Sequence, residues 1–244
     1  MVTNVKENIE KIKAEIAEAA SKSGRSPSQI KLMGVTKYHP VELMVEAAGL
    51  IDLIGENRVQ EAYSKRGAWP EGVKSCPWHL IGHLQRNKIR RALESFQLIE
   101  SIDSLETAVA LDRVLNEGDH LRFPIFIEVN MSREAAKNGV VPEDAEALML
   151  HILKHCPALS LEGLMTVAAN TENETELRGA FGGLRKLRDR LSTATGLELP
   201  ELSMGMSGDF RTAIEEGSTI VRIGSAIFGE RSYAETSYLK KECI

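Results

Sequence analysis

Short apolar stretches alternate with longer helical segments along most of the chain, and this alternation limits the fold more than any other feature. Eight stretches are predicted to be β-strands because they are short, apolar and bounded by polar or turn-forming residues: 31–37, 51–56, 78–82, 97–102, 124–130, 159–167, 201–206 and 219–228. Helical periodicity lies between them, at 41–48, 87–93, 105–116, 143–154, 174–193 and 209–215. Strands that alternate with helices pair in parallel through crossover connections.

Eight such units within 244 residues predict a closed eight-stranded parallel (β/α) barrel of the TIM type. An open, doubly wound sheet is the alternative. An extra N-terminal helix is expected, because apolar residues recur at helical spacing at Val5, Ile9, Ile12, Ile16, Ala19 and Ala20. No low-complexity tract or glycine- and serine-rich linker interrupts the sequence, so residues 1–244 are interpreted as a single domain.

The charge balance and the cysteines exclude several classes of protein. The 30 Lys+Arg and 35 Asp+Glu residues give a net charge of −5, which argues against nucleic acid or an anionic membrane as the main partner. Neither a signal peptide nor an apolar stretch long enough to span a membrane is found. The three cysteines cannot all pair, and the histidines lack partners at metal-ligand spacing. We expect a soluble cytoplasmic protein without a metal site.

Polar residues follow the first three predicted strands, at the end of the barrel where functional groups gather. Lys37 ends the first strand, and a partly desolvated lysine there would have a lowered pKa and a nucleophilic amine. Asn57 and His83 follow the second and third strands and can orient a ligand. A surface lysine, a helix cap at Asn57 and a structural hydrogen bond at His83 are the alternatives.

Two turns rich in glycine and serine follow the seventh and eighth strands, LSMGMSGD at 202–209 and VRIGSA at 221–226. Small residues before a helix let backbone N–H groups approach an anion, and barrels of this type often bind phosphate after strands seven and eight. A tight turn explains each motif equally well. Arg222 has the same parity as Gly224, so both would face the ligand along an extended strand. A buried ion pair is the alternative for Arg222.

A lysine amine at one side of a pocket and a phosphate site at the other suit a phosphorylated aldehyde or ketone. Two hypotheses follow from these residues alone. The first is pyridoxal phosphate held as a Schiff base, and the second is a sugar-phosphate aldolase that uses lysine. The spacing does not distinguish them.

Seven motifs, in the same order along the chain, resemble those of the YggS/PROSC-type pyridoxal phosphate homeostasis proteins. They are GVTK at 34–37, GENRVQE at 55–61, WHLIGHLQRNK at 78–88, SIDS at 101–104, EGLM at 162–165, LSMGMS at 202–207 and VRIGSAIFG at 221–229. The resemblance extends over nearly the whole chain. It implies a single barrel like the N-terminal domain of alanine racemase, with pyridoxal 5'-phosphate bound to Lys37 as an internal aldimine.

The resemblance also assigns roles to other residues. The phosphate is expected at Ser203, Ser207, Gly224 and Ser225, the pyridine ring beside Asn57, His83 and Met204, and Arg222 near the ring nitrogen. Ser225 stands where the family usually has threonine, and it keeps the hydroxyl group. Arg58 and Arg86 stand where tyrosine and serine are common in the family.

The resemblance implies a protein that binds, buffers and delivers pyridoxal phosphate to apo-enzymes and has no strong catalytic activity of its own. Alanine racemases place a second catalytic tyrosine opposite the lysine from an additional domain, which this sequence lacks; strand alternation predicts that Tyr38 points away from Lys37. An arginine at the ring nitrogen would weaken the electron sink. A monomer is expected. Lys137, after the fifth strand, is interpreted as a solvated loop lysine, with contact to departing cofactor as the alternative. A weak amino-acid racemase, or another enzyme that acts on amino acids, is the alternative.

Overall fold

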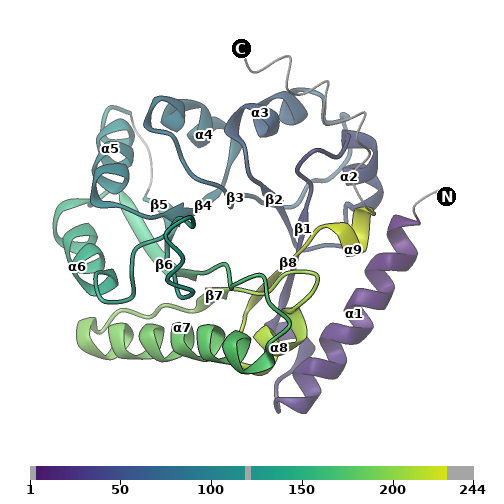
Figure 1. The fold of residues 1–244 in the computed structure, drawn as a ribbon. Coiled ribbons are helices and arrows are strands. Elements are labelled where there is room, and N and C mark those ends of the chain that lie inside the picture. Colours follow the sequence, from purple (N-terminus) through teal and green to yellow (C-terminus); the bar gives the residue numbers. More distant parts are fainter. Residues whose placement is uncertain (1–3, 119–121, 230–244) are drawn as a thin grey trace.

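The computed structural model describes residues 4–118 and 122–229, and its eight strands form a closed barrel in sequence order (Figure 1). β1 pairs in parallel with both β2 and β8, which closes the ring. The strands are β1 (Lys31–Val35), β2 (Leu53–Glu56), β3 (Trp78–Leu80), β4 (Leu98–Ile102), β5 (Phe123–Glu128), β6 (Leu159–Met165), β7 (Glu201–Ser203) and β8 (Ile220–Ile223). The predicted barrel is confirmed, and the open sheet is excluded.

Each strand is followed by a helix, and the helices surround the barrel (Figure 1). They are α2 (Val41–Ala47), α3 (Val59–Gly67), α4 (Ile89–Ser95), α5 (Leu105–Asn116), α6 (Ala145–His155), α7 (Glu174–Thr195), α8 (Phe210–Glu215) and α9 (Ser225–Phe228). Short 3-10 turns at Pro27–Gln29 and Arg86–Lys88 precede β1 and α4. Because every crossover carries the chain back along the outside, all eight strands point the same way.

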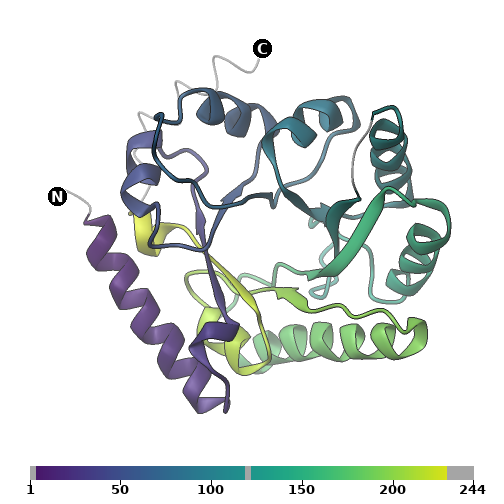
Figure 2. The same cartoon turned by 180° about the vertical axis from the view of Figure 1, so that it is seen from behind.

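The extra N-terminal helix, α1 (Val5–Lys22), lies outside the ring of helices, next to α8 and α9 (Figures 1 and 2). Every apolar residue that predicted it is buried. Asn4 caps its first turn by accepting a hydrogen bond from the backbone N–H of Glu7. Asn8 Nδ2 donates to the carbonyl oxygen of Ile227 at 2.9 Å. This contact ties α1 to α9, the short helix after the last strand.

The buried apolar residues form two clusters. The larger one fills the space between the barrel, the surrounding helices and α1. The smaller one contains only strand residues, as expected for the inside of a barrel: Met33, Leu53, Leu98, Phe126, Met165 and Ile220. Polar side chains share this interior, among them His79, Glu100 and Arg222. The apolar layer therefore supports a polar layer toward the open end of the strands.

Six of the eight predicted strands run too far at their C-terminal ends, whereas β2 and β4 end as predicted. β1 ends at Val35 rather than at residue 37, and β8 ends at Ile223 rather than at residue 228. Gly224 (φ −110°, ψ −86°) leaves the extended conformation, and the apolar residues after it form α9. Ile227 and Phe228 are buried in the core from this helix, so their hydrophobicity does not mark a strand. The expectation that Arg222 and Gly224 face the same side of an extended strand therefore does not apply, because Gly224 lies beyond the end of β8.

Two further expectations bear on the described residues. No helix there is long and apolar enough to cross a membrane. Cys76 and Cys156 are free thiols, and burial raises the pKa of both to about 11. Cys243 lies outside the described residues.

Candidate functional site

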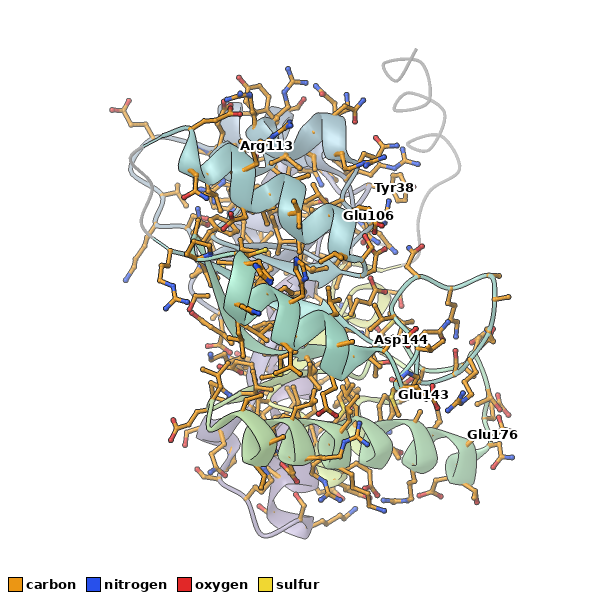
Figure 3. The ribbon with its side chains drawn as sticks, turned by 90° about the vertical axis from the view of Figure 1, so that its left-hand side faces the viewer. Tyr38, Glu106, Arg113, Glu143, Asp144 and Glu176 are labelled. Atoms are coloured by element: carbon orange, nitrogen blue, oxygen red, sulfur yellow. The ribbon has the colours of Figure 1, made fainter. Side chains whose placement is uncertain are left out.

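A cavity of about 1040 Å³ opens at the C-terminal end of the strands. The loops after β1, β2, β3, β5 and β6 line it, with Lys37, Asn57, His83, Glu128 and Lys137 among the polar residues. In Figure 3, Tyr38, Glu143 and Glu176 lie toward one end of the barrel, where β1, β5 and β6 lead into the following helices. The cavity thus brings together Lys37, Asn57 and His83, three of the predicted site residues.

Lys37 lies in a turn whose backbone is held from both sides. Its neighbour Tyr38 has a left-handed backbone with φ 67°, a conformation that costs energy for a residue other than glycine. The Tyr38 backbone N–H donates to Glu61 Oε1 at 2.5 Å, and Thr36 Oγ1 donates to Glu56 Oε1 at 2.6 Å. The position of Lys37 is therefore fixed by two carboxylates.

Lys65, a buried residue of α3, joins these two carboxylates. Its ammonium group donates to Glu56 Oε1, Glu61 Oε1 and the Thr36 carbonyl oxygen, each at 2.7 Å. Burial raises the pKa of Glu56 to about 7, and Lys65 acts in the opposite direction. One buried cation thus holds two carboxylates and one strand end in place beneath Lys37.

Asn57 and Gly82 lie in close contact at the ends of β2 and β3. A Cβ on Gly82 would lie 2.3 Å from the carbonyl oxygen of Asn57, so this position accepts only glycine. Asn57 Oδ1 is buried and has no hydrogen-bond partner among the described residues. A buried amide oxygen without a donor costs free energy, which a ligand with an N–H or O–H group would recover.

Gly82→Ala is expected to lower the free energy of unfolding by about 1–3 kcal/mol, because a backbone atom cannot move away as easily as a side chain. Displacement of Asn57 should also weaken ligand binding in the cavity. Gly179→Ala in α7 is the matched control, since nothing lies within 4 Å of the added Cβ and alanine favours a helix. Urea unfolding of both variants checks the prediction, and equal stabilities would contradict it.

Two histidines on the β3 side contact carboxylates that follow β4 or lie in it. His83 Nδ1 is 2.9 Å from Asp103 Oδ2, and 49% of the His83 side chain is exposed. His79 Nδ1 is 2.7 Å from Glu100 Oε1 in the barrel interior. The structural hydrogen bond considered for His83 is present, yet the ring also lines the cavity.

Glu128 ends β5 and lines the cavity, and the sequence analysis did not single it out. Only 7% of this residue is exposed. Burial raises the pKa of its carboxyl to about 7, the charges of Asp103 and Glu100 raise it further, and Arg222 lowers it. The sequence feature that could have identified Glu128 is an acidic residue at the end of a mostly apolar strand, FPIFIE at 123–128.

The raised pKa of Glu128 predicts how the free energy of unfolding changes with pH. The raised pKa of Glu128 means that the folded state binds the proton more tightly, so stability is lost as the pH rises from about 4.5 to about 7. Glu128→Gln removes this loss. Between pH 5 and pH 8, the free energy of unfolding of this variant should change more favourably than that of the wild type, by about 1–3 kcal/mol. Urea unfolding at both pH values measures the difference.

Glu143→Gln is the matched control for this pH dependence. Its carboxylate is exposed, and a hydrogen bond with Arg133 lowers its pKa. No gain between pH 5 and pH 8 is therefore expected for this variant. An equal gain in both variants would show that Glu128 is not the group responsible.

Arg222 lies inside the barrel and is 4% exposed. Its guanidinium donates to the carbonyl oxygen and Oγ of Ser203, at 2.7 and 2.8 Å, and to the Thr166 carbonyl oxygen at 2.7 Å. Burial lowers its pKa, and the charges of nearby carboxylates raise it. Arg222 therefore bonds neutral acceptors directly and interacts with carboxylates only through their charge.

The predicted phosphate residues lie after β7 and β8. Ser207 belongs to the turn before α8, and Ser225 is the first residue of α9, directly after Gly224. The first N–H groups of a helix have no acceptor inside it. The Ser203 hydroxyl, in contrast, already accepts from Arg222. Met204 is fully buried in the apolar core. The residues that line the cavity described above do not include the predicted site residues on this side of the barrel, Ser203, Met204, Ser207, Arg222, Gly224 and Ser225.

The interpretation of Lys137 from the sequence is wrong, and the strand rule used for Tyr38 does not apply. Tyr38 lines the same cavity as Lys37, and β1 ends at Val35, so the alternation of a strand does not extend to these two residues. Lys137 is not a solvated lysine: its ammonium donates to Glu134 Oε1 at 2.7 Å and to the Ala168 carbonyl oxygen at 2.8 Å. Its side chain is 24% exposed and also lines the cavity.

Comparison with known proteins agrees with this geometry. Residues 5–232 match the family described as alanine racemase, N-terminal domain. A relative from Aquifex aeolicus, named pyridoxal phosphate homeostasis protein, is 38% identical over 231 residues, which cover 94% of this chain and 100% of the relative. This chain belongs to the pyridoxal phosphate homeostasis protein family. The resemblance predicted from the motifs is thereby confirmed.

Solved structures related to this family support the fold. PipY of Synechococcus elongatus, solved with PLP bound, is 34% identical, with a TM-score of 0.75 over 88% of this chain and 100% of PipY. An alanine racemase of Clostridium difficile is 17% identical, with a TM-score of 0.73 over 94% of this chain and 58% of the racemase. The second likeness shows the fold alone, namely the barrel of that enzyme.

Proposed function

We propose that this protein binds pyridoxal 5'-phosphate through a covalent bond to Lys37, buffers the free cofactor and delivers it to apo-enzymes. The observation that carries the proposal is that Lys37 lies in a fixed turn within a large cavity at the mouth of the barrel. Curated relatives named pyridoxal phosphate homeostasis protein, and the PipY structure with PLP bound, support it.

The residues around the cavity fit such a cofactor. The buried Asn57 Oδ1 lacks a donor, which a protonated ring substituent or imine N–H would supply. Ser207 in the turn before α8, together with Gly224 and Ser225 at the start of α9, remain the proposed phosphate residues. The cofactor itself supplies a carbonyl carbon that reacts reversibly with amines. Lys37 provides the amine, and the network under it holds that amine in position.

Arg222 supports a carrier rather than an enzyme. A guanidinium near the ring nitrogen disfavours protonation of that nitrogen, because two positive charges repel each other. The three hydrogen bonds of Arg222 to Ser203 and Thr166 hold the guanidinium in the barrel interior. Without a protonated ring, stabilisation of a carbanion is weak, so fast chemistry on amino acids is not expected.

Delivery is tested with the loaded protein and an apo-enzyme that needs the cofactor. Transfer should be faster than release of the cofactor into buffer, which a scavenger of free cofactor measures separately. Transfer that is no faster than release would refute delivery and leave storage as the function.

A weak amino-acid racemase is the second candidate, and the position of Tyr38 favours it. A phenol that lines the same cavity as Lys37 is a candidate for moving a proton at Cα of an amino acid. Incubation of the loaded protein with single-enantiomer amino acids in deuterated water distinguishes the two functions. A carrier leaves the Cα proton in place, whereas a racemase exchanges it.

The partners and the location remain predictions. We expect a monomer in the cytoplasm, with apo-enzymes as the acceptors of the cofactor. The described residues of one chain line the cavity, which supports the expectation of a monomer.

A further inference from the structure

Glu128 faces Lys37 across the mouth of the barrel. In the closed order β1 to β8, β5 lies four strands from β1 in either direction, so the two ends are opposite each other. Both residues line the same cavity. The Glu128 residue is nearly buried, and the charges that act on its carboxylate are those of Asp103 and Glu100, which have the same sign, and that of Arg222, which has the opposite sign. A nearly buried carboxylate beside two other acids is stabilised by a cation placed next to it.

The neighbours of Glu128 leave this part of the cavity short of positive charge. Asp103 and Glu100 each have one buried carboxylate oxygen, Oδ1 and Oε2, that has no partner within the described part of the chain. Arg222 is the nearby cation that acts on Glu128, but its guanidinium donates hydrogen bonds to Ser203 and Thr166. The remaining partners of these acids are His79 on Glu100 and His83 on Asp103. A ligand cation would therefore be stabilised beside Glu128.

The wall of the cavity formed by the loops after β2 and β3 carries positive charge. Arg58 and Lys88 lie there, whereas Glu128 at the end of β5 is acidic. Lys137 is engaged with Glu134 and a backbone carbonyl. The cavity volume of about 1040 Å³ is at the upper end of the range for pockets that bind small ligands, about 300–1,000 Å³. There is room for a second molecule beside a bound cofactor.

We propose that Glu128, together with Asp103, forms a subsite for the ammonium group of a primary amine that accepts the cofactor. The inference rests on the proposed function, since a cofactor bound to Lys37 would leave by exchange of one amine for another. The incoming ammonium group would give one proton to Glu128, the neutral amine would form a bond to the cofactor carbon, and the bond from that carbon to Lys37 Nζ would break as the lysine nitrogen takes up the proton. An ammonium group carries three donors and a full charge, which match the Glu128 carboxylate and the Oδ1 atom of Asp103, since His83 contacts the other oxygen of Asp103. The amine is either a free amino acid or amine, or the lysine side chain of an acceptor enzyme.

The test compares Glu128→Gln with the loaded wild type and with Glu143→Gln, whose carboxylate is exposed and lies outside the cavity, before α6 (Figure 3). Loss of the cofactor absorbance is followed by stopped flow against increasing Nα-acetyl-lysine amide. The same measurement with semicarbazide uses a nucleophile that is uncharged at neutral pH. Glu128→Gln should lower the second-order rate constant for the lysine derivative about tenfold or more and leave that for semicarbazide within about twofold.

The outcomes separate this subsite from a general role of Glu128. Equal losses with both nucleophiles would show that Glu128 affects access or structure only, and unchanged rates with both would also overturn the proposal. Glu143→Gln should match the wild type with both nucleophiles. An apo-enzyme and a variant of it without its acceptor lysine assign the source: dependence on Glu128 with the intact apo-enzyme indicates a protein lysine, and dependence only with the free derivative indicates a small amine.

A second measurement does not need the bound cofactor. Saturation-transfer NMR of Nα-acetyl-lysine amide with the cofactor-free protein should show contact with the wild type and a clearly weaker signal with Glu128→Gln. If no cofactor binds to Lys37, the proposed function fails, and the NMR comparison still decides the subsite. Equal NMR signals for both proteins would refute the subsite while leaving the proposed function intact.

Discussion

Lys37→Ala is expected to abolish covalent binding of pyridoxal phosphate and to weaken its retention by about 100-fold or more, about 2.7 kcal/mol. The physical reason is that the remaining contacts, to Asn57 and to the turns after β7 and β8, bind the cofactor without a covalent bond. Absorbance titration and equilibrium dialysis measure the loss. The variant should remain folded, since Lys37 lies at the cavity and outside the apolar core.

Lys88→Ala is the matched control, because Lys88 is another lysine that lines the cavity. It should keep the covalent cofactor and lose little affinity. A covalent adduct that survives in Lys37→Ala and disappears in Lys88→Ala would contradict the assignment of Lys37.

Lys65→Met is expected to lower the free energy of unfolding by about 3–5 kcal/mol at pH 7.5, because two buried carboxylates lose their shared cation. Lys65 donates to Glu56 and Glu61 at 2.7 Å, and all three side chains are nearly inaccessible. The cost should shrink toward pH 5, since protonation removes the uncompensated charge. Urea unfolding at the two pH values measures both effects.

Lys31→Met is the control for a lost ion pair at the surface. Lys31 pairs with Glu201 at 2.5 Å, but its side chain is 49% exposed, so about 1 kcal/mol or less is expected. A cost of that size for Lys65→Met would show that the buried network does not hold the turn of Lys37.

The sequence predicts the barrel well because its strands and its helices have different spacings of apolar residues. Eight short apolar stretches and the α1 stripe are local patterns, and the structure reproduces them. The residue at which a strand ends cannot be predicted from such a local pattern. Ile227 and Phe228 extend an apolar run although they belong to a helix, and a one-dimensional pattern cannot distinguish the two.

The site is predictable only where a residue type is itself unusual. Lys37 at a strand end is such a case. Glu61 and Lys65 have the spacing of an ordinary surface pair on a helix, and only the three-dimensional position of α3 turns them inward. Tyr38 faces the cavity because of its left-handed backbone, which no alternation rule anticipates. The raised pKa of Glu128 comes first from burial and then from the charges of Asp103 and Glu100, which are distant in sequence and lie at the neighbouring strand.

The most direct test of the account is the visible absorption spectrum of the purified protein before and after borohydride reduction, with the adduct located by peptide mass spectrometry. We predict a yellow protein that loses its visible band on reduction and carries a stable pyridoxyl group on Lys37. A protein that stays colourless after incubation with pyridoxal phosphate, or an adduct located only on other lysines, would contradict the central claim.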